Sequence, residues 1–262
     1  MNCSCGDFGA AVQRQFTEQI AARDLESYRA KGPDATTRLI RDGLVRAGQV
    51  DGVLLDIGAG VGALTFELLE AGVTHAIAID ASAAYIAAAS SEAARRHRAG
   101  AIQFIQGDFL TVASEVQAAT IVTLDRVICC YPECDPLLAE ALRHAARRFA
   151  FSYPRDVWYV RVWNAVLNGK RRLTGNPFRT YIHAAARMER AITSAGFRLR
   201  DQRRTWTWSI DVYAKPTSGS VQRASTRPTR WLCSPKTENE RSSRDARTMI
   251  LRSPLTGSLN HP

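Results

Sequence analysis

The stretch that most constrains the fold of this chain is an apolar run at 53–57, VLLDI, that passes directly into a glycine-rich turn. The turn carries Gly58, Gly60 and Gly62, and a helix-like segment begins immediately after it. Glycine permits a sharp backbone turn and lets a ligand approach where a Cβ atom would collide. The helix that follows presents free N–H groups to a polar or anionic ligand. The turn also fits the pattern G-x-G-x-x-A of dinucleotide-binding sites, so the turn alone does not exclude a dinucleotide ligand.

Short apolar runs alternate with helix-like segments over residues 51–215, which is typical of βαβ units around a parallel sheet. The expected strands are 53–57, 75–80, 102–107, 120–127 and 148–153, and the expected helices are 63–72, 82–100, 135–148, 155–169 and 183–196. Two further strands, 197–208 and 209–215, adjoin with almost no linker, which predicts an antiparallel pair. We therefore expect an α/β fold, a Rossmann-like doubly wound sheet of about seven strands, mostly parallel with a C-terminal antiparallel hairpin.

The remainder of the chain divides into two extensions. Residues 1–50 predict helices, with a break at Gly32-Pro33 and Asp34 placed to cap the second segment. Residues 216–262 are rich in Ser, Thr and Pro and lack apolar periodicity, which predicts a disordered tail. The expected organisation is a helical N-terminal extension at 1–50, a ligand-binding domain at 51–215 and a disordered basic tail at 216–262.

Composition restricts the class of protein. No apolar run approaches the roughly 18 residues that cross a bilayer, and the N-terminus lacks the pattern of a secretory signal. We therefore expect a cytoplasmic protein without a membrane partner. The six cysteines form no Cys-x-x-Cys pair, which favours reduced thiols, although a metal or redox role for Cys3 and Cys5 stays open. The tail holds eight Lys/Arg and three Asp/Glu, a net of +5 and half of the total of +10. The body is therefore only mildly basic.

Acidic residues stand at the ends of three successive predicted strands. Asp56 lies two residues before Gly58, where a dinucleotide fingerprint normally keeps an apolar residue, and a carboxylate there favours a cationic ligand group. Asp80 ends the second strand, where a carboxylate can accept hydrogen bonds from both hydroxyls of a ribose. Asp108 follows the third strand. Because the carboxyl ends of parallel strands share one rim of the sheet, we expect the three acids to meet in one ligand crevice.

Three motifs together resemble those of the class I S-adenosylmethionine-dependent methyltransferases. LLDIGAGVGALT is similar to their glycine-rich first motif, AIDAS to their acidic second motif and GDF to their adenine-side motif. The resemblance covers roughly residues 35–215. It implies S-adenosylmethionine as the cofactor and an enzyme that transfers its methyl group to a small molecule. The Tyr-Pro segments add a faint likeness to magnesium-protoporphyrin O-methyltransferases, which by itself identifies no acceptor.

The resemblance also implies which residues hold the cofactor. Asp56 would face the amino group of the methionine moiety, Asp80 the ribose and Asp108 the adenine amino group, with Phe109 beside the ring. The full expected set is Asp56, Gly58, Ala59, Gly60, Asp80, Ala81, Gly107, Asp108, Phe109 and Asp125. No metal is expected.

The loop after the fourth predicted strand, which contains Tyr131-Pro132, faces the transferable methyl group in this architecture. Methyl transfer is an in-line displacement at a sulfonium carbon, so the protein chiefly aligns the reacting groups and excludes water. A general base helps only if the acceptor is protonated at neutral pH. Asp125, Tyr131 and His183 are the candidates for that base. Asp125 is equally open to a structural role as an ion pair with Arg126 or a turn residue.

Residues 153–183 interleave aromatic and basic side chains. They include Trp158, Tyr159, Trp163, Phe178 and Tyr181 on one hand, and Arg155, Arg161, Lys170, Arg171, Arg172 and Arg179 on the other. This pattern predicts a lid over a planar or acidic acceptor, or a surface that docks RNA by stacking and phosphate contacts. An amphipathic helix with its tryptophans in the core fits as well as the lid. The alternatives to a small-molecule methyltransferase are therefore an RNA methyltransferase and, less favoured because of Asp56, an NAD(P)-binding oxidoreductase.

Overall fold

The structure is a computed structural model that describes residues 5–216. These residues fall within one compact unit. The tail predicted at 216–262 lies outside the described residues apart from Pro216, and so do Cys3 and the side chain of Cys5. No helix among the described residues is both long enough and apolar enough to cross a bilayer.

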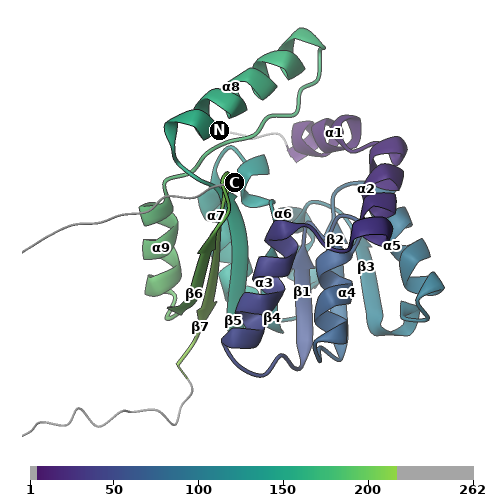
Figure 1. The fold of residues 1–262 in the computed structure, drawn as a ribbon, viewed down its shortest axis with the longest axis vertical. Helices are drawn as coiled ribbons and strands as arrows, with labels where there is room; N and C mark the ends of the chain where they lie inside the picture. The colour runs from purple at the N-terminus through teal and green to yellow at the C-terminus, as the bar shows by residue number, and fades with distance from the viewer. Residues whose placement is uncertain (1–4, 217–262) are drawn as a thin grey trace, which may run out of the picture. The chain divides into compact units, whose positions relative to one another are not determined.

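A seven-stranded sheet with the order β3-β2-β1-β4-β5-β7-β6 forms the centre of this unit (Figure 1). The strands are β1 (Val53–Ile57), β2 (His75–Asp80), β3 (Ile102–Gln106), β4 (Ala119–Leu124), β5 (Ala145–Pro154), β6 (Arg198–Arg204) and β7 (Trp208–Ala214). The first five are parallel, and β7 pairs antiparallel with both β5 and β6. The predicted mostly parallel sheet with a C-terminal antiparallel hairpin is confirmed. The strand order reverses between β1 and β4, which is where ligands bind in such sheets.

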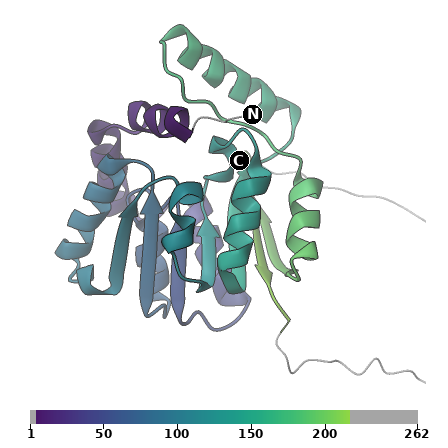
Figure 2. The same ribbon diagram turned by 180° about the vertical axis from the view of Figure 1, so that it is seen from behind.

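Helices cover both faces of the sheet, as Figures 1 and 2 show. One face carries α3 (Ala35–Arg46), α4 (Ala63–Glu70) and α5 (Ala83–Arg95), and the other carries the short α6 (Phe109–Val112), α7 (Cys134–His144) and α9 (Ala185–Ser194). Alternate strand residues explain the two layers, because Leu54 packs in one hydrophobic cluster and Leu55 in the other. Leu54 and Leu55 are both fully buried, so helices cover the sheet on both sides.

Three more helices lie beyond the carboxyl ends of the parallel strands (Figures 1 and 2). They are α1 (Cys5–Gln15), α2 (Glu18–Lys31) and α8 (Trp158–Leu173). The predicted cap is confirmed, because the Asp34 side chain accepts a hydrogen bond from the Thr37 backbone N–H at the start of α3 (3.1 Å). These helices stand over the edge of the sheet where the crevice is expected.

Several element boundaries differ from the sequence-based prediction; the helix predicted at 82–100, for example, ends at Arg95. Strand β4 ends at Leu124 because Arg126 adopts a left-handed backbone conformation, φ 62°, which does not continue a strand. The helix predicted at 135–148 ends earlier, at His144, because β5 begins at Ala145, where it pairs with Ala119 of β4. Helix α8 continues through Gly169, because side chains before and after that glycine hydrogen-bond to the following loop.

Candidate active site

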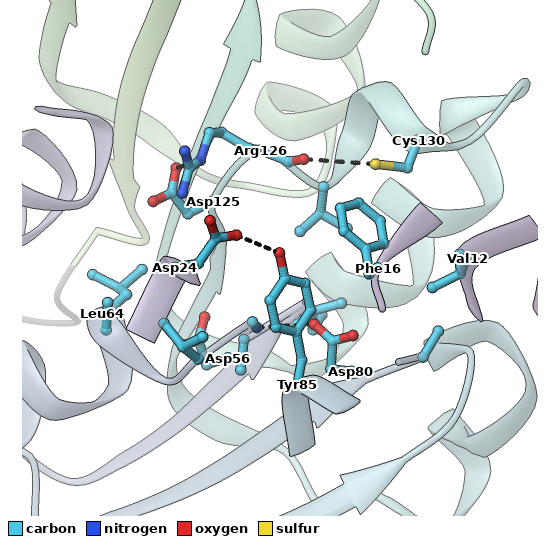
Figure 3. A pocket seen from close by; sticks show the side chains of 18 of the residues that line it. Val12, Phe16, Asp24, Asp56, Leu64, Asp80, Tyr85, Asp125, Arg126 and Cys130 are labelled. Atoms are coloured by element: carbon cyan, nitrogen blue, oxygen red, sulfur yellow. Dashed lines mark hydrogen bonds and ion pairs between the residues drawn. The ribbon is translucent and has the colours of Figure 1, made fainter. Parts of the chain in front are cut away.

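A cavity of about 460 Å³ opens at the carboxyl ends of β1, β2 and β4, and residues of α1, α2 and α3 close it from above (Figure 3). Its volume lies in the range of small-ligand sites. The predicted cofactor residues that line it are Asp56, Gly58, Ala59, Gly60, Asp80, Ala81, Gly107, Phe109 and Asp125. Of the three predicted bases, Asp125 and Tyr131 line it and His183 does not. The described residues contain no group of three or more His, Cys, Asp or Glu side chains that could hold a metal ion.

The glycine turn between β1 and α4 forms the floor of this cavity. Gly58, Gly60 and Gly62 have φ angles of 70°, 56° and 80°, a conformation that side chains other than glycine rarely adopt. A Cβ atom on Gly58 would also meet the Cγ2 atom of Val127 at 2.3 Å. The turn is fastened to β2, because the backbone N–H of Gly58 donates to the carbonyl of Ile79 (2.7 Å). At Gly58, glycine is therefore required both by backbone conformation and by space.

Asp56 is buried at the end of β1 and borders the cavity. Its two carboxyl oxygens accept hydrogen bonds from the hydroxyls of Thr65 and Thr123, both at 2.7 Å. Burial raises the pKa of Asp56 to about 7, although the two hydroxyls act in the opposite direction. No Lys, Arg or His among residues 5–216 forms an ion pair with it. The carboxylate therefore lacks a cationic partner that a ligand could supply.

Asp80 at the end of β2 has a similar environment. Its carboxyl oxygens accept hydrogen bonds from the backbone N–H groups of Gly60 and Ser82, both at 2.8 Å. Burial raises its pKa to about 6 despite these bonds. Each carboxyl oxygen has a second lone pair, so the side chain can accept further hydrogen bonds from ligand hydroxyls. Figure 3 shows Asp56, Asp80 and Asp125 around the same cavity.

Asp108 differs from the other two acids because it does not line the cavity. It caps α6 by accepting from the Leu110 backbone N–H (3.1 Å), and it accepts from the Tyr131 hydroxyl (2.5 Å). Burial and the neighbouring Asp108 carboxylate raise the pKa of Tyr131 far above its usual range, so the phenol keeps its proton. The Phe109 ring packs in the core, 5.5 Å from the imidazole of His144. Contact of Asp108 and Phe109 with adenine stays a prediction.

Asp125 lies just beyond the end of β4 and is held by two hydroxyl groups. Thr37 donates to one carboxyl oxygen (2.7 Å) and Ser152 to the other (2.6 Å). The Nε atom of Arg126 lies 3.9 Å from a carboxyl oxygen of Asp125, and the guanidinium instead approaches Asp34 to 2.6 Å. Asp125 therefore has a fixed orientation at the cavity wall, and its role as a base stays a prediction.

His183 holds the loop that carries Tyr131. Its Nε2 atom lies 3.1 Å from the carbonyl oxygen of Ile128 and 3.0 Å from that of Tyr131. Because carbonyl oxygens only accept hydrogen bonds, Nε2 carries the proton. The structure thus places this imidazole behind the cavity wall, where it fixes the loop rather than facing the ligand space.

The comparisons with known proteins agree with this geometry. A family model described as a methyltransferase domain matches residues 54–148, which include the glycine turn and the three acids. The chain therefore carries a methyltransferase domain over these residues. This result also removes support from the nicotinamide oxidoreductase alternative. No curated protein matches the sequence.

Solved structures similar to this chain share its fold at low identity. Magnesium protoporphyrin IX methyltransferase from Synechocystis PCC 6803, with bound S-adenosylhomocysteine, is 21% identical, and the match covers 80% of this chain and 100% of that one with a TM-score of 0.60. Human N-acetylserotonin methyltransferase in complex with S-adenosylmethionine is 16% identical over 79% and 58% of the two chains, with a TM-score of 0.54. The cyclase SpnF is 15% identical over 78% and 96%, with a TM-score of 0.56. These likenesses establish the fold, and the cyclase shows that the fold hosts more than one chemistry.

The cavity is also closed by residues that lie outside the sequence motifs. Phe16 and Tyr85 pack with ring centroids 5.3 Å apart, and the Tyr85 hydroxyl donates to Asp24 of α2 (2.8 Å; Figure 3). All three line the cavity. They lie in or beside helices without a motif, so only their position in the fold reveals them.

Arg171 of α8 also reaches the cavity. Its Nη1 atom donates to Asn168 (3.1 Å) and to the hydroxyl of Thr180 (3.0 Å), and its guanidinium lies over the Phe178 ring, 5.1 Å from the centroid. Within residues 5–216 no carboxylate pairs with it, and its Nε and Nη2 atoms have no hydrogen-bond partner. The guanidinium is therefore oriented by neutral groups while its charge stays unpaired in the part of the chain that the structure describes.

Proposed function

We propose that the domain binds S-adenosylmethionine in this cavity and transfers the methyl group by direct in-line displacement to a small anionic acceptor. The observation that carries the proposal is the pair of buried carboxylates, Asp56 and Asp80, which border one cavity beside the glycine turn without a cationic partner in residues 5–216. When bound, the cofactor supplies an electrophilic methyl group on a sulfonium. Asp56 would receive the cationic amino group of the methionine moiety and Asp80 the ribose hydroxyls.

Arg171 supports an anionic acceptor. A guanidinium with two free donor atoms suits a planar carboxylate, which it can bind with two parallel hydrogen bonds. An acceptor whose oxygen is already ionised needs no general base. This agrees with Tyr131, whose phenol keeps its proton and acts as a hydrogen-bond donor to Asp108.

Asp125 is the base that we propose for a protonated acceptor, because it lines the cavity in a fixed orientation. Tyr131 would then act by positioning, and His183 by holding the loop. The cavity walls contribute by excluding water, and the two helices α1 and α2 supply much of that cover.

Isothermal titration with S-adenosylhomocysteine tests the cofactor site. We expect the wild-type chain to bind and Asp80→Asn to bind about 10- to 100-fold more weakly, since hydrogen bonds to a charged group contribute about 1.5–3 kcal/mol. Asp51→Asn is the matched control, because Asp51 pairs with Arg147 before the start of β1, away from the cavity. Equal affinity of Asp80→Asn and wild type, or no binding by wild type, would contradict the proposal.

A further inference from the structure

Helix α8 has its apolar side turned outward. Trp158, Val162, Val166 and Leu173 are 75%, 55%, 58% and 90% exposed. Their spacing of four, four and seven residues places them on one side of the helix. We call these four residues the outer face of α8. In an ordinary surface helix this apolar stripe would face the core.

The inner side of α8 is largely polar and well bonded. The side-chain amides of Asn164 and Asn168 both donate to the carbonyl oxygen of Thr180, at 2.9 Å and 2.7 Å. Arg171 continues this side into the cavity, and Val160 is the only residue of α8 that is buried. Folding of the domain thus explains the inner side but leaves the outer face without a partner among the described residues. The hypothesis that the tryptophans of this segment are core residues is wrong, because Trp158 and Trp163 are both exposed.

The charged side chains of α8 itself are all basic. Helix α8 contains Arg161, Lys170, Arg171 and Arg172 and no acidic residue. Arg161 pairs with Asp156, whereas Lys170 and Arg172 form no ion pair within residues 5–216. Both are exposed and follow the apolar residues toward the end of the helix.

Two more tryptophans extend the apolar surface. Trp163 of α8 is 60% exposed and Trp206, in the turn between β6 and β7, is 76% exposed. Trp206 is tied to the start of α8, because its ring packs edge-on against Tyr159 with centroids 5.7 Å apart. Exposed tryptophan beside unpaired basic residues is typical of surfaces that contact the interfacial region of a membrane.

We propose that the outer face of α8 docks the protein on the surface of an anionic lipid bilayer. The helix would lie in the plane of the interface, with Trp158, Val162, Val166 and Leu173 among the upper acyl chains. Lys170 and Arg172 would lie at the level of the anionic headgroups, which supply the missing counter-charge. With 16 residues the helix is too short to span, so the contact is peripheral. The expectation of no membrane partner rested on spanning segments alone.

Charge complementarity favours a bilayer over the other occupants. A second copy would bring an α8 that also carries Lys170 and Arg172 and no acidic residue, so the helix of neither copy would supply a counter-charge. The segment 216–262, at +5, is basic as well. RNA would supply phosphates, and Trp158 offers a ring on which a base can stack, but Val162, Val166 and Leu173 offer none and would stay exposed to water. An anionic bilayer satisfies the apolar stripe and the charges together.

Docking in this orientation would bring the cavity close to the lipid, because α8 carries the outer face on one side and Arg171 on the other. An amphiphilic acceptor with an anionic head could then pass between the bilayer and Arg171. This consequence rests on the proposed function. The docking itself does not, and it is measured without cofactor or acceptor.

Cosedimentation of the full chain with vesicles of phosphatidylcholine, with and without phosphatidylglycerol, tests the docking. We expect binding to the anionic vesicles only. Each basic residue near an anionic surface contributes about a factor of five, so Lys170→Gln/Arg172→Gln should lower the partition coefficient about 25-fold, and Val162→Glu/Val166→Glu by at least as much. Tryptophan emission should shift to shorter wavelength on binding.

Matched controls separate this face from overall charge. Arg98→Gln/Arg200→Gln removes two exposed charges elsewhere, and Val45→Glu changes an exposed valine on α3, so both should bind as wild type does. Unchanged thermal unfolding would show that the α8 variants are folded. Equal loss in the control pair, wild-type binding by Val162→Glu/Val166→Glu, or no vesicle binding by wild type overturns the proposal. A dimer that Val162→Glu/Val166→Glu dissociates, or salt-sensitive RNA binding in place of vesicle binding, would assign the face to those partners instead.

Discussion

Two hydroxyl groups, those of Thr65 and Thr123, are the hydrogen-bond donors that hold the Asp56 carboxyl in its buried position. They orient the carboxylate but bring no positive charge, so burial still raises its pKa to about 7. A group with a raised folded-state pKa contributes stability below its unfolded pKa, and this contribution is lost as the pH rises through about 7. At higher pH the free domain therefore carries a buried charge at a cost in stability, which a cationic ligand would offset.

Asp56→Asn should make the free domain more stable at pH 8, by on the order of 2–4 kcal/mol, while abolishing the carboxylate that we assign to the ligand's amino group. At pH 5, where Asp56 is protonated in the folded state but ionised in the unfolded chain, the difference should be smaller, and it should disappear only as the pH falls below the unfolded pKa of an aspartate. Urea unfolding at both pH values measures the difference, and titration with S-adenosylhomocysteine at pH 8 should show weaker binding by the variant. Equal stability at pH 8 would mean that the carboxylate is neutralised in another way.

Arg171→Gln tests acceptor recognition at the same scale. The change keeps two hydrogen-bonding groups but removes the charge, so turnover of anionic acceptors should fall by about 10- to 100-fold, mainly through KM. The assay is formation of S-adenosylhomocysteine with a panel of aromatic carboxylates and phenols, each beside its neutral amide or ether. Arg172→Gln is the control, because that neighbouring side chain is exposed and does not line the cavity. If the carboxylates and their neutral analogues are affected alike, Arg171 does not select charge.

At the scale of elements, the cover over the cavity depends on a buried carboxylate between α2 and α5. The fully buried Glu92 of α5 accepts hydrogen bonds from Arg29 of α2 (2.8 Å) and from Arg95 and Arg96 of its own helix (2.8 Å and 2.7 Å). The bond from Arg95, with those from Arg96 and Arg29, holds the pKa of Glu92 well below its usual range. Its stabilising contribution is therefore present above the unfolded pKa of a glutamate and is lost as the pH falls.

Glu92→Gln should destabilise the domain by about 2–3 kcal/mol, at the lower end for a broken buried ion pair because the arginines keep some solvent. The amides of α2 should exchange hydrogen faster, and the affinity for S-adenosylhomocysteine should fall because Asp24 and Tyr28 of α2 line the cavity. Hydrogen exchange and urea unfolding at pH 7 measure these effects. Glu115→Gln, at an exposed position, should leave both unchanged. If α2 exchanges at the wild-type rate, this contact does not hold the cover.

The sheet could be predicted from the sequence because its strands carry a local signal, an apolar run that ends at a glycine or an acid. Asp56, Gly58 and Asp80 all line the cavity for this reason. The cover carries no such signal. Helix α8 packs through Asn164, Asn168 and Arg171 and exposes its apolar residues, which is the reverse of the pattern from which burial is inferred. Asp108 has the expected place in sequence, but only the fold reveals that Tyr131 and the α6 cap engage it.

For the whole molecule, the reversal of strand order between β1 and β4 explains why residues distant in sequence meet in one cavity. The parallel strands on either side of that point deliver the glycine turn, Asp80 and Asp125 to the same edge of the sheet. The cyclase of similar fold shows that this architecture does not fix the reaction. The reaction is therefore to be sought in side chains such as Asp56, Asp80 and Arg171 rather than in the topology.

A ligand that binds between β1, β2 and the covering helices should stabilise the whole domain against unfolding. At a concentration about 100 times its Kd, S-adenosylhomocysteine should add about 2.7 kcal/mol, which raises the Tm of a domain of this size by roughly 5–10 °C. Because the ligand needs Asp56 and Asp80 ionised, and burial raises their pKa values to about 7 and about 6, the increase measured by calorimetry at pH 8 should shrink at pH 5.5. NAD⁺ at the same concentration should leave the Tm unchanged. An equal increase in Tm at both pH values would mean that neither carboxylate titrates on binding. An increase in Tm with NAD⁺ but not with S-adenosylhomocysteine would indicate a nicotinamide-binding protein instead.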